Sequence, residues 1–167
     1  MRLRYGAGAI LLVALHAEIH AAQSVKIARA FADESGTLHV ALANGQDIVV
    51  PKEKGQTGAA DIKITSDHQT VGWLVGYPNP DPDRAWEKLY GELVLWRDGK
   101  VIRRFSTELV FWSWDFWQDG KQVRFHTGPL HGAGRFELHD LETGRLVKAI
   151  DEEVTQTLPD WAESLSP

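Results

Sequence analysis

Short stretches in which apolar and polar residues alternate run through the chain, most clearly in residues 108–126 (ELVFWSWDFWQDGKQVRFH). On the first limb every second side chain is large and apolar, and a β-strand would place them on one face: Val110, Trp112, Trp114 and Phe116. The other parity forms a mixed face: Phe111, Ser113, Asp115 and Trp117. The Asp119-Gly120 pair then turns the chain into a second alternating limb. The pattern predicts a β-hairpin with one face in a core.

Similar alternating stretches, separated by turn residues, recur on both sides of this hairpin. They predict about eleven short strands, near residues 25–31, 38–42, 48–50, 62–65, 71–75, 93–96, 101–105, 110–117, 122–126, 136–139 and 146–150. Asn44-Gly45 is a strong hairpin signal, and we expect a type I′ turn with positive φ at both residues. In the tail, Leu158, Trp161 and Leu165 follow helical spacing after Pro159, which predicts a short helix that docks Trp161 on the sheet.

These elements predict an all-β fold of short antiparallel strands with a short C-terminal helix. A length of 167 residues suits one domain with a substantial core. Polar turns that contain glycine recur after every second strand, at residues 98–99, 119–120 and 143–144. Two such spacings make a four-stranded unit of roughly 45 residues, within the range of propeller blades.

One family resemblance accompanies this pattern. The run WDFWQDGKQVRFHTG (residues 114–128), followed by FELHDLETGRLV (residues 136–147), resembles the WD-like β-propeller repeat of bacterial periplasmic proteins. A weaker copy covers residues 62–105, so the resemblance spans about two repeats, from Asp61 to Ile150. Trp117 and Gln118 stand where the repeat usually has Ser and Pro. The resemblance implies a fold and carries no catalytic residues.

Two clear units and a degenerate first one are too few to close a ring, because propellers typically have four to eight blades. The sequence therefore predicts an incomplete propeller of blade-like units or a sandwich-like stack. Pro51, Lys52, Lys54 and the acidic tail could protect open sheet edges. We expect a compact monomeric stack whose tail covers one edge, with self-association as the alternative.

The net charge and the N-terminal residues indicate the class of partner and the cellular location of the protein. The formal net charge of −5 argues against a nucleic-acid partner. Arg2 and Arg4 precede an apolar run at residues 7–15, which is too short to span a membrane, and Ala21-Ala22 offers a cleavage point. We expect a signal peptide at residues 1–22, a single all-β domain at residues 23–167 and a periplasmic or secreted protein. The absence of cysteine excludes disulfides and thiolate metal ligands.

Candidate catalytic chemistry is sparse. Three histidines lie close together in sequence and suggest a zinc site: His126, His131 and His139. His126 and His139 fall on polar strand parities, however, so we expect separate surface histidines and no metal or cofactor. The sequence contains no Gly-x-Ser-x-Gly elbow and no carboxylate pair in an apolar setting. These patterns predict a protein that is not an enzyme.

Aromatic residues outside the expected core are the remaining candidates for ligand binding. Trp112, Trp114 and Phe116 are expected to fill the core, whereas four others could stack on a sugar ring or anchor a partner: Trp86, Tyr90, Phe111 and Trp117. The sequence thus predicts an exported, non-enzymatic binding or scaffold protein that mediates protein–protein interaction through WD-like repeats. The alternative is a protein that binds a carbohydrate or cell-wall ligand through exposed Trp and Tyr. The partner, protein or glycan, stays unidentified.

Overall fold

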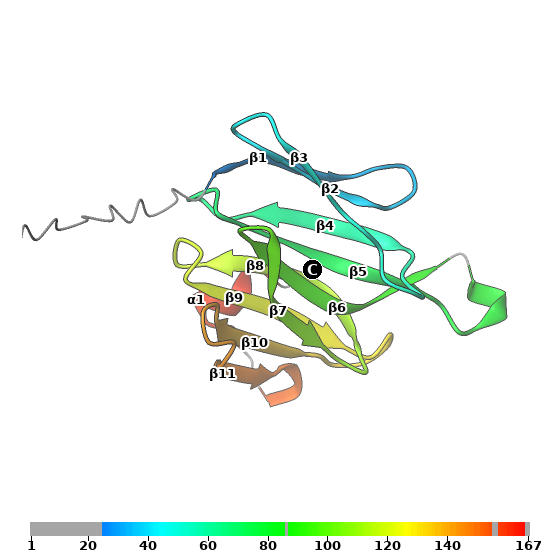
Figure 1. The fold of residues 1–167 in the computed structure, drawn as a ribbon. Coiled ribbons are helices and arrows are strands. Elements are labelled where there is room, and N and C mark those ends of the chain that lie inside the picture. Colours follow the sequence, from blue (N-terminus) through cyan, green and yellow to red (C-terminus); the bar gives the residue numbers. More distant parts are fainter. Residues whose placement is uncertain (1–24, 86, 155–156, 166–167) are drawn as a thin grey trace, which may run out of the picture.

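A computed structural model describes residues 25–85, 87–154 and 157–165. The expected signal peptide at residues 1–22 and the candidate Trp86 lie outside these residues. Within them, eleven antiparallel strands form three sheets, accompanied by one short α-helix (Figure 1). The all-β class and the C-terminal helix are therefore confirmed. No helix in the described ranges is long and apolar enough to cross a membrane.

Each sheet is a meander in which strands that follow one another in sequence pair with one another. The N-terminal sheet contains β1 (Ile27–Ala32), β2 (Leu38–Leu42) and β3 (Asp47–Val50). The central sheet contains β4 (Gly58–Ile64), β5 (Thr70–Pro78), β6 (Lys88–Arg97) and β7 (Lys100–Ser106). The C-terminal sheet contains β8 (Val110–Trp117), β9 (Gln122–Gly128), β10 (Arg135–Asp140) and β11 (Leu146–Asp151). Short 3₁₀ turns, η1 (Pro82–Arg84) and η2 (Glu152–Val154), and the helix α1 (Asp160–Glu163) complete the fold.

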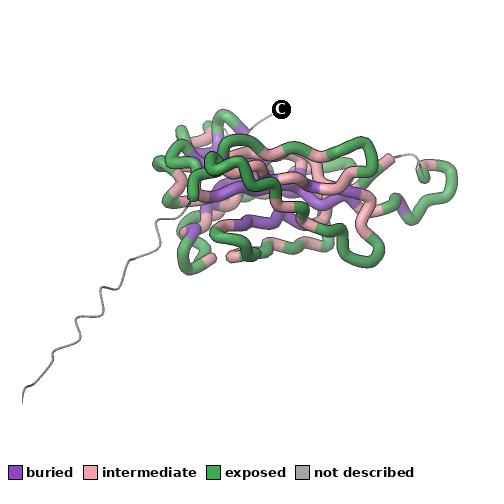
Figure 2. Tube along the Cα trace, turned by 45° about the horizontal axis from the view of Figure 1, so that its top comes forward, coloured by how far each residue is buried: buried purple, intermediate pink, exposed green. Residues whose placement is uncertain are grey.

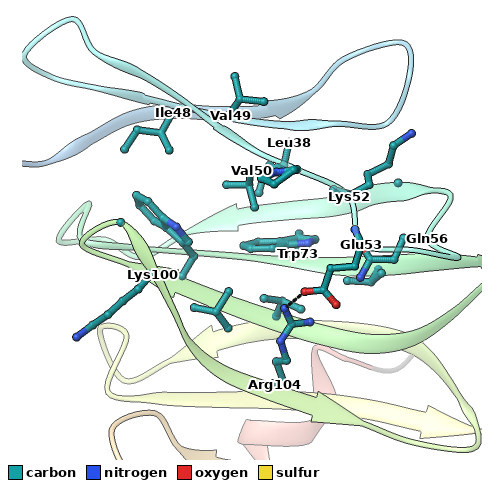
Figure 3. Close-up of a pocket in the computed structure, with 18 residues that line it drawn as sticks. Leu38, Ile48, Val49, Val50, Lys52, Glu53, Gln56, Trp73, Lys100 and Arg104 are labelled. Atoms are coloured by element: carbon teal, nitrogen blue, oxygen red, sulfur yellow. Dashed lines mark hydrogen bonds and ion pairs between the residues drawn. The ribbon is translucent and has the colours of Figure 1, made fainter.

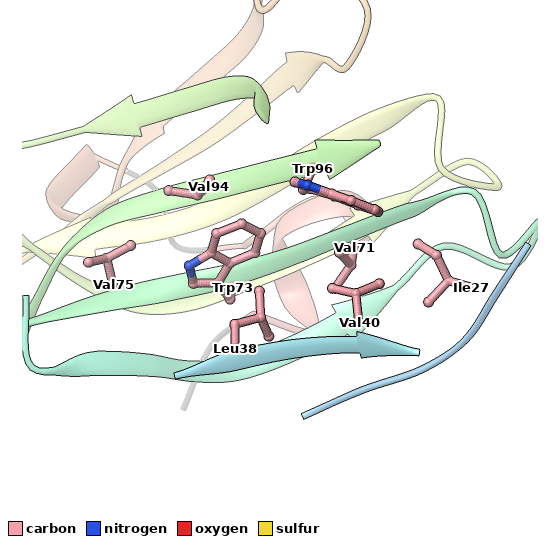
Figure 4. Close-up of a cluster of buried hydrophobic side chains, with 8 residues drawn as sticks. All are labelled: Ile27, Leu38, Val40, Val71, Trp73, Val75, Val94 and Trp96. Atoms are coloured by element: carbon pink, nitrogen blue, oxygen red, sulfur yellow. The ribbon is translucent and has the colours of Figure 1, made fainter. Parts of the chain in front are cut away.

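The three sheets are stacked, and the central sheet is buried on both faces (Figures 1 and 2). One core lies between the N-terminal and central sheets and contains Ile27, Leu38, Val40, Val71, Trp73, Val75, Val94 and Trp96 (Figure 4). A second core lies between the central and C-terminal sheets and contains Leu74, Leu93, Leu95, Phe111, Trp114, Val123, Phe125 and Leu141. Because β5 and β6 are buried on both sides, they read as nearly continuous apolar runs.

The C-terminal helix covers a face of the C-terminal sheet, which corrects the expectation that the tail covers an edge. Trp161 packs with Phe136 and Leu138 of β10 in a third cluster. The Arg124 guanidinium donates a hydrogen bond to the Trp161 carbonyl at 3.0 Å, and Ser113 Oγ donates one to the Leu165 carbonyl at 2.6 Å. The amphipathic spacing had predicted the docking of Trp161, but not which surface receives it.

A β-bulge at Trp112 changes the faces predicted for β8. The pairing of β8 with β9 shifts between Phe111 and Ser113, which leaves Trp112 as the extra residue. Phe111 therefore shares the core face with Trp114, while Trp112 lies on the other face against His126, with ring centroids 4.6 Å apart. The predicted faces of Phe111 and Trp112 are wrong because a bulge interrupts the period of two.

The Asn44-Gly45 hairpin forms with a different turn from the one predicted. Gly45 has a φ of 87°, whereas Asn44 keeps a negative φ. Leu42 accepts a hydrogen bond from the Gly45 N–H at 3.0 Å and donates one to the Gln46 carbonyl at 2.8 Å. This is a type I turn followed by a glycine bulge, which places one more residue in the loop than a type I′ turn does.

Candidate functional site

A groove with a volume of about 320 Å³ opens between the N-terminal and central sheets, beside the outer edge of β3 (Figure 3). We call it the β3–β7 groove. Its apolar floor belongs to the central sheet and is formed by Trp73, Val75, Val94, Trp96 and Val101. Ile48 and Val50 of β3 form one wall, and charged side chains form the rim: Lys52, Glu53, Lys100 and Arg104.

The groove exists because the N-terminal sheet is one strand narrower than the sheet below it. β1 lies over β4 and β5, and β3 is the last strand on the other side of the N-terminal sheet in the described part of the chain. β7 is therefore left without a covering strand. Val101 pairs across the ladder with Trp96, so both side chains face the groove, and Val101 is 38% exposed.

The outer edge of β3 offers backbone hydrogen-bonding groups to this groove. The Leu42 N–H donates to the Gln46 carbonyl, so the backbone groups of Gln46 point toward β2. Backbone groups alternate in direction along an antiparallel strand, so those of Ile48 and Val50 also point toward β2, opposite Val40 and Leu38. The N–H and C=O groups of Asp47 and Val49 then point outward. Pro51 has no N–H and ends this open edge.

An ion-pair network closes the end of the groove nearest Val50. Arg104 Nη1 lies 3.2 Å from both carboxylate oxygens of Glu92, and Arg104 Nη2 pairs with Glu53 in the loop after β3. Burial disfavours the Arg104 charge, but hydrogen bonds and attraction from Glu92 and Glu53 outweigh it and raise the pKa of Arg104. The guanidinium is thus held charged and ties the loop to β7.

The rim also carries two lysines with exposed side chains, Lys52 and Lys100. Lys52 Nζ donates to the Ser35 carbonyl at 2.5 Å, and neither lysine forms an ion pair within the described ranges. Since Glu53 is paired with Arg104, the remaining rim charge is positive on a chain whose net charge is −5. The groove can therefore bury apolar side chains and attract a carboxylate.

The aromatic residues predicted as ligand contacts do not form one surface. Phe111 is 3% exposed in the core between the central and C-terminal sheets, and Tyr90 packs against that same core. Trp117 lies on the outer face of the C-terminal sheet, half-buried beside the C-terminal helix cluster, with the Arg124 guanidinium 4.2 Å from its ring centre. The structure brings Tyr90 and Phe111 to one core and leaves Trp117 on the other side of the sheet.

The three histidines predicted as a candidate zinc site lie in different environments: His126 is buried, His139 is partly buried and His131 is exposed. His126 is fully buried and stacks on Phe136 with ring centroids 3.9 Å apart, so its predicted solvent exposure is wrong. Its Nε2 lies 3.5 Å from the Glu152 carboxylate, and burial lowers its pKa against that attraction. His139 is hydrogen-bonded to Glu137 at 2.7 Å. No group of three potential metal ligands occurs in the described residues.

Sequence patterns alone missed the β3–β7 groove. Its residues come from stretches that are well separated along the chain, and no local pattern brings them together. One signal was present: three alternating stretches precede residue 58, whereas four occupy each of the next two units. Counting strands per unit predicts a sheet that is one strand short, but not where the uncovered surface faces.

No protein-family model matches the chain, and no curated protein matches it in sequence. Among solved structures, a chain of the crystal structure of a mitotic checkpoint complex aligns with 90% of this chain and 76% of its own length. The identity is 10% and the TM-score is 0.26. A likeness this weak carries no functional argument, and the candidate site rests on its own geometry.

Proposed function

We propose that this protein is an exported, non-enzymatic scaffold that holds a segment of a partner protein in the β3–β7 groove. The observation that supports this function is the part of the central sheet left uncovered beside an open strand edge. Val101 is 38% exposed across the ladder from Trp96, and Trp96 and Trp73 are buried beside it in the groove floor. Apolar surface that adjoins free backbone groups is typical of a protein-binding surface.

The chemistry of the groove favours binding over catalysis. Its lining combines aliphatic and indole side chains with lysine, arginine and one paired glutamate, and the described lining includes no histidine, serine or aspartate. Export is proposed from the basic and apolar pattern of residues 1–22. A glycan partner has less support, because Tyr90, Phe111 and Trp117 do not share one surface.

Site-specific photo-crosslinking in the cells that produce the protein tests the proposal. A photoreactive amino acid at Val101 lies in the groove, and one at Leu146 provides a matched control, because Leu146 is 44% exposed on the C-terminal sheet. We expect a discrete adduct with another protein from position 101 and none from position 146. Equal adducts from both positions, or none from position 101, would contradict the proposed function.

A further inference from the structure

The open edge of β3 indicates how a partner segment is held. Building on the proposed function, we propose that the groove takes an extended, acidic peptide segment of a partner protein, which pairs with β3 as a fourth strand of the N-terminal sheet. Each of the other two sheets has four strands, so the added strand would complete the stack. Strand addition to an exposed edge is a recurring mode of peptide recognition.

The first argument is the backbone of β3. The outward N–H and C=O groups of Asp47 and Val49 are spaced two residues apart, as an incoming strand requires. The edge spans four residues and stops at Pro51, so it pairs with a segment of about four to six residues at about 3.3 Å per residue. An extended peptide satisfies these groups, whereas a helix leaves them without partners.

The second argument is the floor beneath the added strand. An incoming strand beside β3 lies over β7 and the outer side of β6, where Trp96, Val101 and Val94 face the groove. Every second side chain of that strand points to this floor, and the side chains between them point to solvent. The floor selects apolar residues at alternate positions.

The third argument is the charge of the rim. Lys100 lies at the turn between β6 and β7, and Lys52 lies just beyond Val50, so the two residues lie near different ends of the β3 edge. Their side chains extend outward from the groove, and Lys52 Nζ donates to the Ser35 carbonyl, so both add positive charge to the rim without entering the groove (Figure 3). Arg104 is neutralised by Glu53 and Glu92. Carboxylates near the ends of the bound segment complement the two lysines, and the apolar alternation lies between them.

A second copy of this chain fits less well. Its own β3 already packs Ile48 and Val50 against its own central sheet, so the same two side chains would have to cover two floors. Its net charge of −5 would also repel an identical copy. The geometry therefore points to a segment of another protein.

The test is selection from a random heptapeptide library on the full chain, followed by affinity measurements with the selected synthetic peptides. Val49→Pro removes one outward N–H and leaves the bonds between β2 and β3 in place, whereas Val49→Thr keeps that N–H and serves as the matched control. We expect enriched peptides with alternating apolar residues and terminal Asp or Glu. Their affinity should fall roughly tenfold in Val49→Pro and stay nearly unchanged in Val49→Thr.

A charge reversal tests the rim separately. Lys100→Glu should weaken the acidic peptides by about threefold to tenfold, while Lys148→Glu on the distant β11 makes the same change in net charge with little effect. Peptides that bind Val49→Pro and Val49→Thr equally, no enrichment, or dimerisation that Val49→Pro abolishes would each overturn strand addition by a partner. A Val101 adduct that persists in Val49→Pro would leave the proposed function standing without this binding mode.

Discussion

The two faces of the central sheet both take their buried residues from β5 and β6, yet the two faces are covered differently. Toward the C-terminal sheet, Leu93 and Leu95 are completely buried under a four-stranded sheet, whose own Trp114 is also completely buried. The face toward the N-terminal sheet is also apolar, but only three strands cover it. On that face Trp73 and Trp96 line an open groove. The number of covering strands, and not the apolarity of the floor, decides which face can receive a ligand.

The closed face depends on one close fit. The Trp114 ring lies over Gly72, where a β-carbon would come within 2.5 Å of the indole. The indole Nε1 donates to the Asp61 carbonyl at 3.0 Å, and Lys63 Nζ donates to the Trp114 carbonyl. Trp114 thus joins the C-terminal sheet to the first strand of the central sheet.

The largest difference between the faces should appear when one tryptophan is removed from each. Trp114→Ala should cost about 3–5 kcal/mol in unfolding free energy, because it leaves an enclosed cavity. Trp73→Ala should cost less, about 2–3 kcal/mol, because water can enter from the open groove. Urea denaturation of both variants measures the difference. Equal losses would show that the groove is as closed as the opposite face.

A smaller loss is expected when a methyl group is inserted at the close fit. Gly72→Ala should destabilise the protein by about 1–3 kcal/mol, because the added carbon overlaps Trp114 and Leu95. Gly91→Ala in β6 is the matched control, since its nearest neighbours are 3.7 Å or more from the added carbon. Thermal unfolding compares the two variants. A stable Gly72→Ala protein would indicate that the closed face is loosely packed.

The smallest effect at neutral pH is expected outside both faces, at His126. Burial lowers its pKa, so the native state binds fewer protons than the unfolded state, and stability should fall as pH drops below the ordinary histidine pKa of about 6.5. His126→Leu should stay within about 1.5 kcal/mol of the parent at pH 8 and lose part of this acid sensitivity. Urea midpoints at pH 8 and pH 5 measure it.

The control for His126 is His131→Leu, which changes an exposed histidine in a loop. This variant should keep the acid sensitivity of the parent protein. The same pH dependence in all three proteins would place its origin elsewhere. If acid weakens the closed and open faces alike, the central sheet responds as one unit.

Much of the fold was predictable from local pattern. Alternation located all eleven strands of the described residues, because a half-buried strand repeats its environment every two residues. The prediction failed at Trp112, where the bulge reverses the faces, and at Asn44, where a glycine bulge replaces the type I′ turn. Both failures add one residue that changes register without changing composition.

The candidate site was much less predictable. Phe111 was predicted as a ligand contact but belongs to the core, because the bulge exchanged its face with that of Trp112. Trp73 and Trp96 are buried, at 6% and 4% exposure, yet they also line the groove. Burial and ligand access are compatible at the margin of a sheet, and a residue pattern does not show where that margin lies.

The sequence by itself determined the strands, their order as meanders and the position of the short helix, because alternation, turn residues and helical spacing act over a few neighbours. The tertiary structure alone decided that the N-terminal sheet ends at β3 and leaves β7 uncovered, and that the helix covers a face. Those outcomes depend on how wide one sheet is relative to the next. Sheet width is a property of the stack, and it leaves the open edge of β3 beside an apolar floor.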